Sequence, residues 1–241
     1  VPSLARPPHV ALLGECMLEL QGQAFGTMRQ TFGGDTLNTA VYLARCAPDV
    51  SVHFATAVGD DPLSEGLVQR WQAEGVATDL VRRVPGRLPG LYLIETDAHG
   101  ERRFSYWRDT SAAKVYFEVD ATPLEARAAE WQALYLSGIT LAILPPAGRE
   151  RLYALMHSMR ERGAMVALDN NYRPRLWPDR DEARTCFARA LDLATVALVS
   201  LDDHQALFGA ACDGSELQAA EAIVKRGADA TQVRPAPLAA W

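Results

Sequence analysis

The regular alternation of short apolar runs with longer amphipathic stretches is the feature that most constrains how this chain folds. In the second half, apolar runs at 134–136, 165–168 and 196–199 are predicted to be strands. Predicted helices follow them at about 147–162, at about 181–191 and from about 201 toward Gly209. Strands that alternate with helices indicate a mostly parallel, doubly wound α/β sheet.

The first half of the chain continues this rhythm. The predicted elements are a buried strand at 10–13, a more exposed strand at 17–20, a loop or edge strand at 22–31, a helix from the Gly33-Gly34 pair to about 47, a strand at 52–57 and a helix at about 63–74. Pro48 and Gly75 follow the two helices, where such residues commonly end a helix. Both halves therefore predict one α/β architecture.

A segment of different character lies between these halves. Residues 90–95 and 103–108 are strand-like, and the turn-forming run 96–100 separates them, which predicts a hairpin. Tyr92 is predicted to lie on one face of its strand, and Tyr106 and Arg108 on one face of the other. These side chains either form ordinary cross-strand pairs or cover a site. A small sheet beside an α/β body suggests a lid.

Charge and cysteine content narrow the class of protein. The formal net charge of −6 does not suggest a nucleic-acid partner. Four cysteines without CxxC spacing indicate buried, reduced thiols, which favours a cytoplasmic protein. The longest apolar stretch is too short to span a bilayer, which takes roughly 20 residues. The five histidines show no shared spacing with Asp or Ser, and we assign none of them to catalysis.

The stretch Gly33-Gly34-Asp35-Thr36-Leu37-Asn38 is the first candidate binding site. Glycines allow close approach of a ligand to the backbone, and N–H groups at a helix start are unpaired donors. Asp35 is predicted to be the N-cap, with Asn38 one turn later. These groups together suit a hydroxyl-rich or anionic small molecule. An ordinary strand-to-helix turn explains the same pattern equally well.

Polar residues also follow two predicted strands of the second half. They are the runs 169–173 and 200–203. In doubly wound sheets, ligands bind beyond the carboxyl ends of the strands. Both runs are therefore further candidates for a binding site.

Several separated motifs, taken together and in order, resemble the ribokinase-like (PfkB) sugar kinases. They are Gly33 to Asn38, Thr56 to Leu63, Gly75-Val76, Arg87 to Tyr92, Gly100 to Arg108 and Leu168 to Trp177. The last three narrow the resemblance to the 2-keto-3-deoxygluconate (KDG) kinases. The resemblance covers about residues 10–230, and several motifs in the right order are specific where any one would be weak.

This resemblance implies a ribokinase-like three-layer α/β/α fold with a mostly parallel central sheet and a small β lid. It implies one kinase domain over 9–241, with its C-terminal part missing and the lid formed by about 15–32 and 88–110. The implied reaction is ATP-dependent phosphorylation of KDG at its 6-hydroxyl, with Mg²⁺. A homodimer through the lid is implied as well. Alternatives are a kinase for another sugar, such as fructose or a ribonucleoside, and a non-catalytic sugar-binding homologue.

The resemblance also assigns residues to the site. The implied substrate contacts are Gly34, Asp35, Asn38, Tyr92, Tyr106, Arg108 and Arg173. Arg173 is a candidate for either the substrate carboxylate or the transferring phosphate, and Glu19 replaces an Asp that many relatives have near the substrate. The implied ATP contacts are Asn171, Ser200, Lys225 and Gly227. Asp203 is the candidate for water-mediated Mg²⁺ binding, or else a solvated carboxylate at a helix start.

The sequence departs from the family pattern near the end of the chain. The family's anion hole and catalytic Asp would lie beyond Trp241, so the catalytic residue is unknown and little kinase activity is expected of the chain as written. Residues 215–223 are predicted to be a helix, yet a strand matching the family follows at once. An αβ connection usually takes about 2–6 residues. We therefore expect that residues are omitted here and that the gene product is longer.

Overall fold

The protein, described from a computed structural model, divides into two compact units. The first consists of Val1–Pro8 and Leu12–Ala126, and the second of His9–Ala11 and Arg127–Trp241. The structure describes residues 7–23, 25–96, 99–209, 221–225 and 232–234. Strand β1, His9–Leu13, therefore contributes its first residues to the second unit and its last residues to the first.

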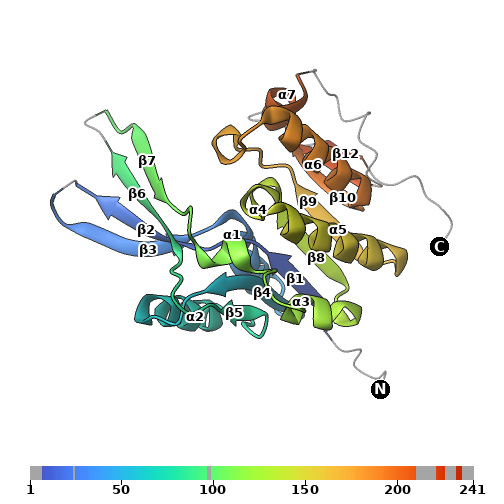
Figure 1. Ribbon diagram of the computed structural model, residues 1–241, viewed down its shortest axis with the longest axis horizontal. Helices are drawn as coiled ribbons and strands as arrows, with labels where there is room; N and C mark the ends of the chain where they lie inside the picture. Colours follow the sequence, from blue (N-terminus) through green and yellow to red (C-terminus); the bar gives the residue numbers. More distant parts are fainter. Residues whose placement is uncertain (1–6, 24, 97–98, 210–220, 226–231, 235–241) are drawn as a thin grey trace. The chain divides into compact units, whose positions relative to one another are not determined.

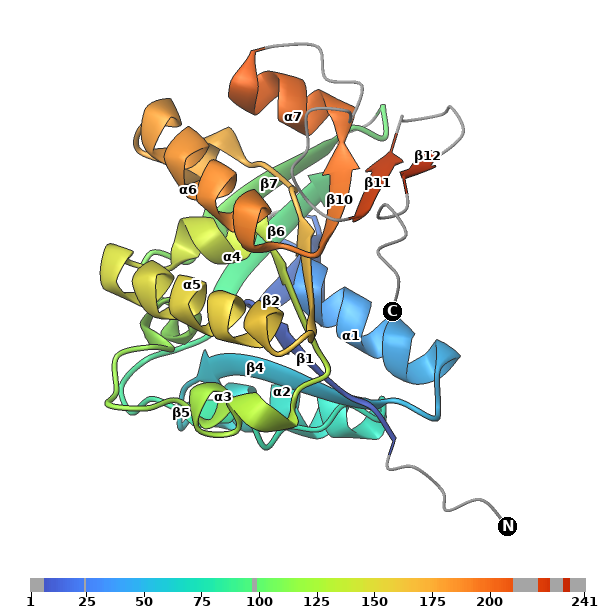
Figure 2. The same cartoon turned by 90° about the vertical axis from the view of Figure 1, so that its right-hand side faces the viewer.

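The second unit has the predicted alternation of strands and helices. Its main elements are β8 (Ala133–Ser137), α4 (Gly138–Ile143), α5 (Pro146–Glu161), β9 (Met165–Asp169), α6 (Arg180–Leu193), β10 (Val196–Ser200), α7 (Leu201–Phe208), β11 (Glu221–Lys225) and β12 (Gln232–Arg234). Strands β8, β9, β10 and β11 pair in parallel, in that spatial order, and β12 pairs antiparallel with β11. Helices α5 and α6 lie side by side against this sheet (Figure 2).

The parallel strands of this unit are buried because helices cover them. Leu134, Leu136, Val166 and Leu168 are fully buried. Next to the sheet, Phe187 of α6 packs edge-on against Tyr172, with their ring centroids 5.8 Å apart. A continuous apolar strand with such a covering is the usual sequence signature of a parallel sheet.

The first unit combines a piece of parallel sheet with a separate small sheet (Figure 1). Its main elements are β2 (Met17–Gly22), β3 (Met28–Gly33), α1 (Asp35–Cys46), β4 (Ser51–Val58), α2 (Pro62–Ala73), β5 (Val81–Arg83), β6 (Gly90–Thr96) and β7 (Arg102–Trp107). Strands β4 and β5 pair in parallel. Phe54 of β4 packs edge-on against the fully buried Trp71 of α2, with ring centroids 5.3 Å apart.

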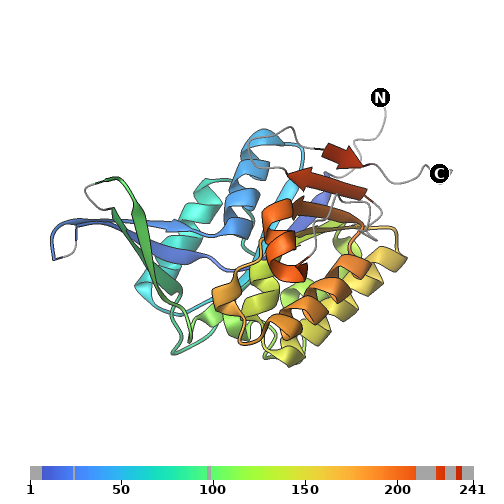
Figure 3. The ribbon, with the colours of Figure 1, turned by 90° about the horizontal axis from the view of Figure 1, so that it is seen from above.

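The small sheet has the strand order β3-β2-β6-β7, and Figure 3 shows it from above. The predicted hairpin is confirmed, because β6 and β7 pair antiparallel with Tyr92 opposite Tyr106. Strand β2 pairs in parallel with β6 and antiparallel with β3. The segment predicted as loop or edge thus contains an edge strand, β3, which pairs with β2.

Three predictions about local structure were wrong, and one short helix was missed. Gly34, not Asp35, is the N-cap of α1; Asp35 is the first helical residue, and its Oδ1 accepts from the neighbouring N–H of Thr36 at 2.8 Å. The predicted helix over 215–223 is wrong at its end, because 221–225 form β11, which pairs with β10. Cys46 is exposed rather than buried. The short helix α4 was missed, although Ser137 and Thr140 form a capping box at its start.

Candidate functional site

The Gly33-Gly34 turn is built against the connection between β1 and β2. A Cβ atom on Gly34 would lie 2.2 Å from the carbonyl oxygen of Glu15, so only glycine fits there. Helix α1 starts at this point, and the N–H of Asn38 donates to the carbonyl of Gly34 at 2.8 Å. Asn38 is exposed, and Gly34 and Asp35 are partly exposed. The structure therefore leaves these three predicted substrate contacts accessible.

A row of polar and aromatic side chains crosses the small sheet next to this turn. Glu19, Tyr92 and Tyr106 occupy matched positions on β2, β6 and β7. The Tyr92 hydroxyl donates a hydrogen bond to Oε2 of Glu19, and the Tyr92 and Tyr106 ring centroids are 5.9 Å apart. A Cβ atom on Gly33 would lie 2.6 Å from the Tyr92 hydroxyl. Close packing thus brings the glycine turn and the aromatic row together.

Burial and the Glu19 carboxylate both raise the pKa of the Tyr92 hydroxyl, with burial the larger cause. Tyr92 is therefore protonated at neutral pH and acts as a hydrogen-bond donor. The sequence could not resolve the role of Glu19, and the structure makes this carboxylate the acceptor that holds the Tyr92 ring in place.

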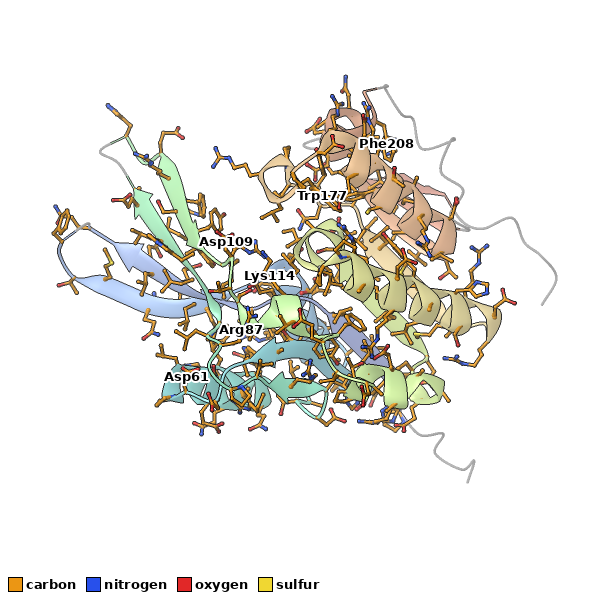
Figure 4. The ribbon with its side chains drawn as sticks, viewed as in Figure 1. Asp61, Arg87, Asp109, Lys114, Trp177 and Phe208 are labelled. Carbon is orange, nitrogen blue, oxygen red and sulfur yellow. The ribbon has the colours of Figure 1, made fainter. Side chains whose placement is uncertain are left out.

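Arg108 follows β7 directly and precedes Asp109, which Figure 4 labels. Its side chain is 9% exposed, and its Nη2 donates to Oε2 of Glu15, whose side chain is 1% exposed. Sequence analysis missed Glu15. The signal that was available is its place directly after Gly14, at the end of a buried strand, where a charged side chain needs a partner.

In the second unit, Asn170 ties together the ends of β9 and β10. Its Oδ1 accepts from the N–H of Asn171 and of Ser200, each at 2.9 Å, and its Nδ2 donates to the Ser200 carbonyl at 2.9 Å. A Cβ atom on Gly138 would lie 2.2 Å from the Asn170 carbonyl oxygen. The predicted ATP contacts Asn171 and Ser200 are thus adjacent, and Asn171 has the positive φ of 24°.

Arg173 and Asp203 form an ion pair at the same edge of the second unit. Arg173 Nη1 lies 3.4 Å from Oδ1 of Asp203, and the two side chains are 51% and 24% exposed. In the part of the chain that the structure describes, no three His, Cys, Asp or Glu side chains gather into a metal-binding cluster. A single carboxylate suits Mg²⁺ that keeps most of its waters and binds substrate phosphates. Asp203 lies in the first turn of α7 and pairs with Arg173.

The two remaining predicted ATP contacts are less fully described. Lys225 ends β11, where its backbone lies opposite Ser200 of β10. The Lys225 backbone therefore lies beside Ser200, at the carboxyl ends of the neighbouring strands β10 and β11. Gly227 lies outside the described residues.

A pocket of about 250 Å³ in the first unit contains none of the predicted site residues. It is lined by Leu18, Gln30, Thr31, Phe32, Pro62, Leu63, Gly66, Leu67 and Arg70. Leu18 precedes Glu19 on β2, and successive residues of a strand point to opposite faces. This pocket therefore opens on the other face of the small sheet from the Glu19–Tyr92–Tyr106 row.

A hydrogen-bonded Ser–His–Asp chain also occurs in the first unit, although no sequence motif connects these three residues. The Ser51 hydroxyl lies 2.9 Å from Nε2 of His53, and Nδ1 of His53 lies 2.7 Å from Oδ1 of Asp79. His53 is buried, and Ser51 is not part of a G-x-S-x-G motif. We interpret this chain as a structural link between β4 and the segment before β5.

Comparison with known proteins decides the family. Residues 8–234 match the pfkB family of carbohydrate kinases. The chain belongs to this family. The 2-dehydro-3-deoxygluconokinase of Dickeya dadantii is 44% identical over 93% of this chain and 75% of its own length. The enzyme of the same name from Escherichia coli K12 is 42% identical over 93% of this chain and 75% of its own length.

A fructokinase from Klebsiella pneumoniae is more distant from this kinase, at 29% identity over 82% of the chain and 62% of the relative. Among solved structures, a 2-dehydro-3-deoxygluconokinase from Thermotoga maritima covers 90% of this chain and 72% of its own, with 23% identity and a TM-score of 0.78. At that identity the likeness shows the fold. The predicted ribokinase-like α/β fold, with a mostly parallel sheet and a smaller second sheet, is confirmed.

Membership of this family makes the chain a phosphotransferase-type sugar kinase with ATP as co-substrate. For such a kinase, the first unit offers accessible backbone and side-chain groups at the start of α1, together with a buried guanidinium. Within the described ranges, no helix combines the length and apolar character that crossing a membrane requires.

Proposed function

We propose that this kinase transfers the γ-phosphoryl group of ATP to the 6-hydroxyl of 2-keto-3-deoxygluconate, also called 2-dehydro-3-deoxygluconate. The single observation that carries the proposal is the 44% identity, over 93% of the chain, to a relative of that name. The fructokinase relative is 29% identical, which favours the sugar acid over the neutral sugar.

The chemistry of the first unit supports an acidic substrate. KDG carries a carboxylate, and a guanidinium offers a planar set of donors that matches a carboxylate. Arg108 is such a group, and Glu15 connects it to the Gly33-Gly34 turn. Gly34, Asp35 and Asn38 would hold the sugar hydroxyls, and Tyr92 and Tyr106 would contact the substrate from the small sheet. In this proposal the small sheet acts as the lid of one kinase domain.

The second unit would serve the nucleotide. Asn171, Ser200, Lys225 and Gly227 would contact ATP, and Arg173 would meet either the substrate carboxylate or the transferring phosphate. Asp203 would hold water around Mg²⁺, which supplies charge stabilisation to the phosphates when it is bound. The pairing of Arg173 with Asp203 at 3.4 Å keeps both groups at one edge of this unit.

The test uses the product of the complete coding sequence and compares KDG with D-fructose, with calorimetry for binding and a coupled assay for ADP release. KDG-dependent ADP release that exceeds fructose-dependent release at least tenfold is the expected result. A preference for fructose or a ribonucleoside would overturn the proposal in favour of another sugar kinase. KDG binding without ADP release would overturn it in favour of a sugar-binding homologue.

We also propose a homodimer formed through the small sheet. Trp107 of β7 is 59% exposed, and Leu88, just before β6, is exposed as well. Large exposed side chains of this kind mark interaction surfaces. Light scattering should give twice the monomer mass, and Trp107→Lys should shift the population toward monomer. A monomeric wild-type protein would contradict this proposal.

The location proposed for the kinase is the cytoplasm. Cys16, Cys46 and Cys186 are free thiols in the structure, as is usual where thiols are kept reduced. Cys212 lies outside the described residues. Fractionation of the native host, with the protein followed by antibody, tests the proposal. Recovery in the periplasmic or membrane fraction would overturn it.

A further inference from the structure

The proposed reaction assigns no contact with the sugar, ATP or Mg²⁺ to the buried carboxylate of Glu15. It lies in the connection between β1 and β2, and the residue is 3% exposed. Carboxylates are rarely buried to this degree unless they are paired. Its Oε2 accepts a hydrogen bond from Nη2 of Arg108, which is itself 9% exposed.

This ion pair does not use all of its hydrogen-bonding capacity. Oε1 of Glu15 and Nε of Arg108 are both buried and have no hydrogen-bond partner. A guanidinium carries five N–H donors, and burial makes each unused polar atom costly. A pair selected for stability alone would be saturated or replaced by apolar side chains. The pair therefore retains hydrogen-bonding capacity that no described protein group satisfies.

Two glycines keep the Glu15 side chain and backbone in place. A Cβ atom on Gly90 would lie 2.7 Å from Oε1 of Glu15 and 3.2 Å from Cβ of Arg108. A Cβ atom on Gly34 would lie 2.2 Å from the Glu15 carbonyl oxygen. Glu15 is thus fixed between the start of β6 and the start of α1. The position of the Arg108 guanidinium follows from that of Glu15.

We propose that Glu15 is a positioning residue, which holds the Arg108 guanidinium so that its remaining N–H donors face the carboxylate of the sugar acid. The inference rests on the proposed function. Because the pair as a whole is neutral, it would favour an acid through oriented donors rather than through an isolated buried charge. Glu15 would therefore affect the binding of the sugar acid and not that of a neutral sugar.

The experiment measures binding of KDG and of D-fructose by calorimetry, for the wild type and for Glu15→Gln. The amide keeps the shape of the side chain and one acceptor oxygen but loses the charge that strengthens the hydrogen bond. We expect Kd for KDG to rise about tenfold and Kd for D-fructose to change less than about twofold. Glu65→Gln is the matched control, since Glu65 pairs with Arg83 at 2.6 Å on the exposed surface.

A double-variant cycle separates positioning from a general structural role. If Glu15 acts through Arg108, then Glu15→Gln should add no further loss of KDG affinity in an Arg108→Gln background. Additive losses, equal losses for both sugars, or tighter KDG binding by Glu15→Gln would each overturn the proposal. Tighter binding would mean that Glu15 competes with the substrate for Arg108.

Gly90→Ala gives a second test that removes neither charge. Its new methyl group would displace the Glu15 carboxylate, and it should also weaken KDG binding selectively. This variant decides the matter if Glu15→Gln does not fold. If the wild type does not prefer KDG to D-fructose, the proposed function fails and the role of Glu15 fails with it. If the wild type prefers KDG and both variants retain that preference, only the role of Glu15 fails.

Discussion

The two arginines that sequence analysis selected as anion contacts have opposite surroundings. Arg108 in the first unit is 9% exposed and pairs with the buried Glu15. Arg173 in the second unit has a side chain that is 51% exposed and pairs with Asp203 at 3.4 Å. Each arginine lies next to a carboxylate, yet only Arg108 is buried away from water.

This difference separates a pre-positioned contact from an adaptable one. A buried ion pair has lost its hydration, so removing one partner leaves an uncompensated charge. An exposed pair exchanges its partner for water at little cost, and salt screens it. We therefore expect Arg108 to be a fixed part of the binding site and Arg173 to change partners when a ligand arrives.

The largest expected effect comes from breaking the buried pair. Glu15→Ala should lower the free energy of unfolding by about 3–5 kcal/mol, because the Arg108 charge would remain buried without its partner. Urea unfolding followed by circular dichroism measures the change. A loss below about 1 kcal/mol would mean that water reaches Arg108 and that the two arginines are equivalent after all.

A smaller loss is expected at Asn170, a neutral but buried polar residue of the second unit. Asn170→Ala should cost about 1–3 kcal/mol, because the N–H and C=O groups of Ser200 lose their partner. The same unfolding measurement tests this prediction. An effect as large as that of Glu15→Ala would show that burial, rather than charge, sets the cost.

Asp61 is the N-cap of α2, and its hydrogen bonds predict how the stability of the protein responds to pH. Burial by itself would raise the pKa of Asp61, but hydrogen bonds from the Ser64 hydroxyl and from the N–H groups of Ser64 and Leu63 outweigh it and lower the pKa. The unfolded chain therefore binds a proton more readily than the folded protein does. The stability from this group is present above the unfolded pKa and is lost as the pH falls through the folded pKa.

Asp61→Asn keeps an acceptor for the cap and removes this titration. The variant should lose less stability than the wild type between pH 5 and pH 3, and urea unfolding at several pH values measures the difference. Glu65→Gln, on the same helix, is the control that leaves the cap intact. Identical acid sensitivity of Asp61→Asn and wild type would contradict the assignment.

The smallest effect is expected at the exposed pair. Arg173→Ala should change the free energy of unfolding by no more than about 1 kcal/mol, and added salt should reduce even that change. Unfolding in low and high salt measures both quantities. A loss comparable to that of Glu15→Ala would show that Arg173 is part of the structural core of the second unit.

The sequence was sufficient for most of the elements, because strands and helices of these lengths reveal themselves through apolar periodicity and capping residues. The hairpin of residues 90–95 and 103–108 followed from the same kind of reasoning and is confirmed, and the structure adds that Tyr92 pairs with Tyr106. The error at 221–223 has a physical reason: a short segment with mixed apolar spacing becomes a strand when β10 offers it a partner. The missed N-cap at Gly34 has another reason, since Asp35 is itself a good capping residue.

The amino-acid sequence determined the α/β architecture, the hairpin and the family, since these depend on local pattern and on motifs that can be read in order. Only the tertiary structure showed that Glu15 holds Arg108 and that Asn170 joins two strand ends. Both contacts connect residues far apart in the chain, 93 positions in one case and 30 in the other. A partner for a buried polar group is chosen by where the fold places it, and no local pattern carries that information.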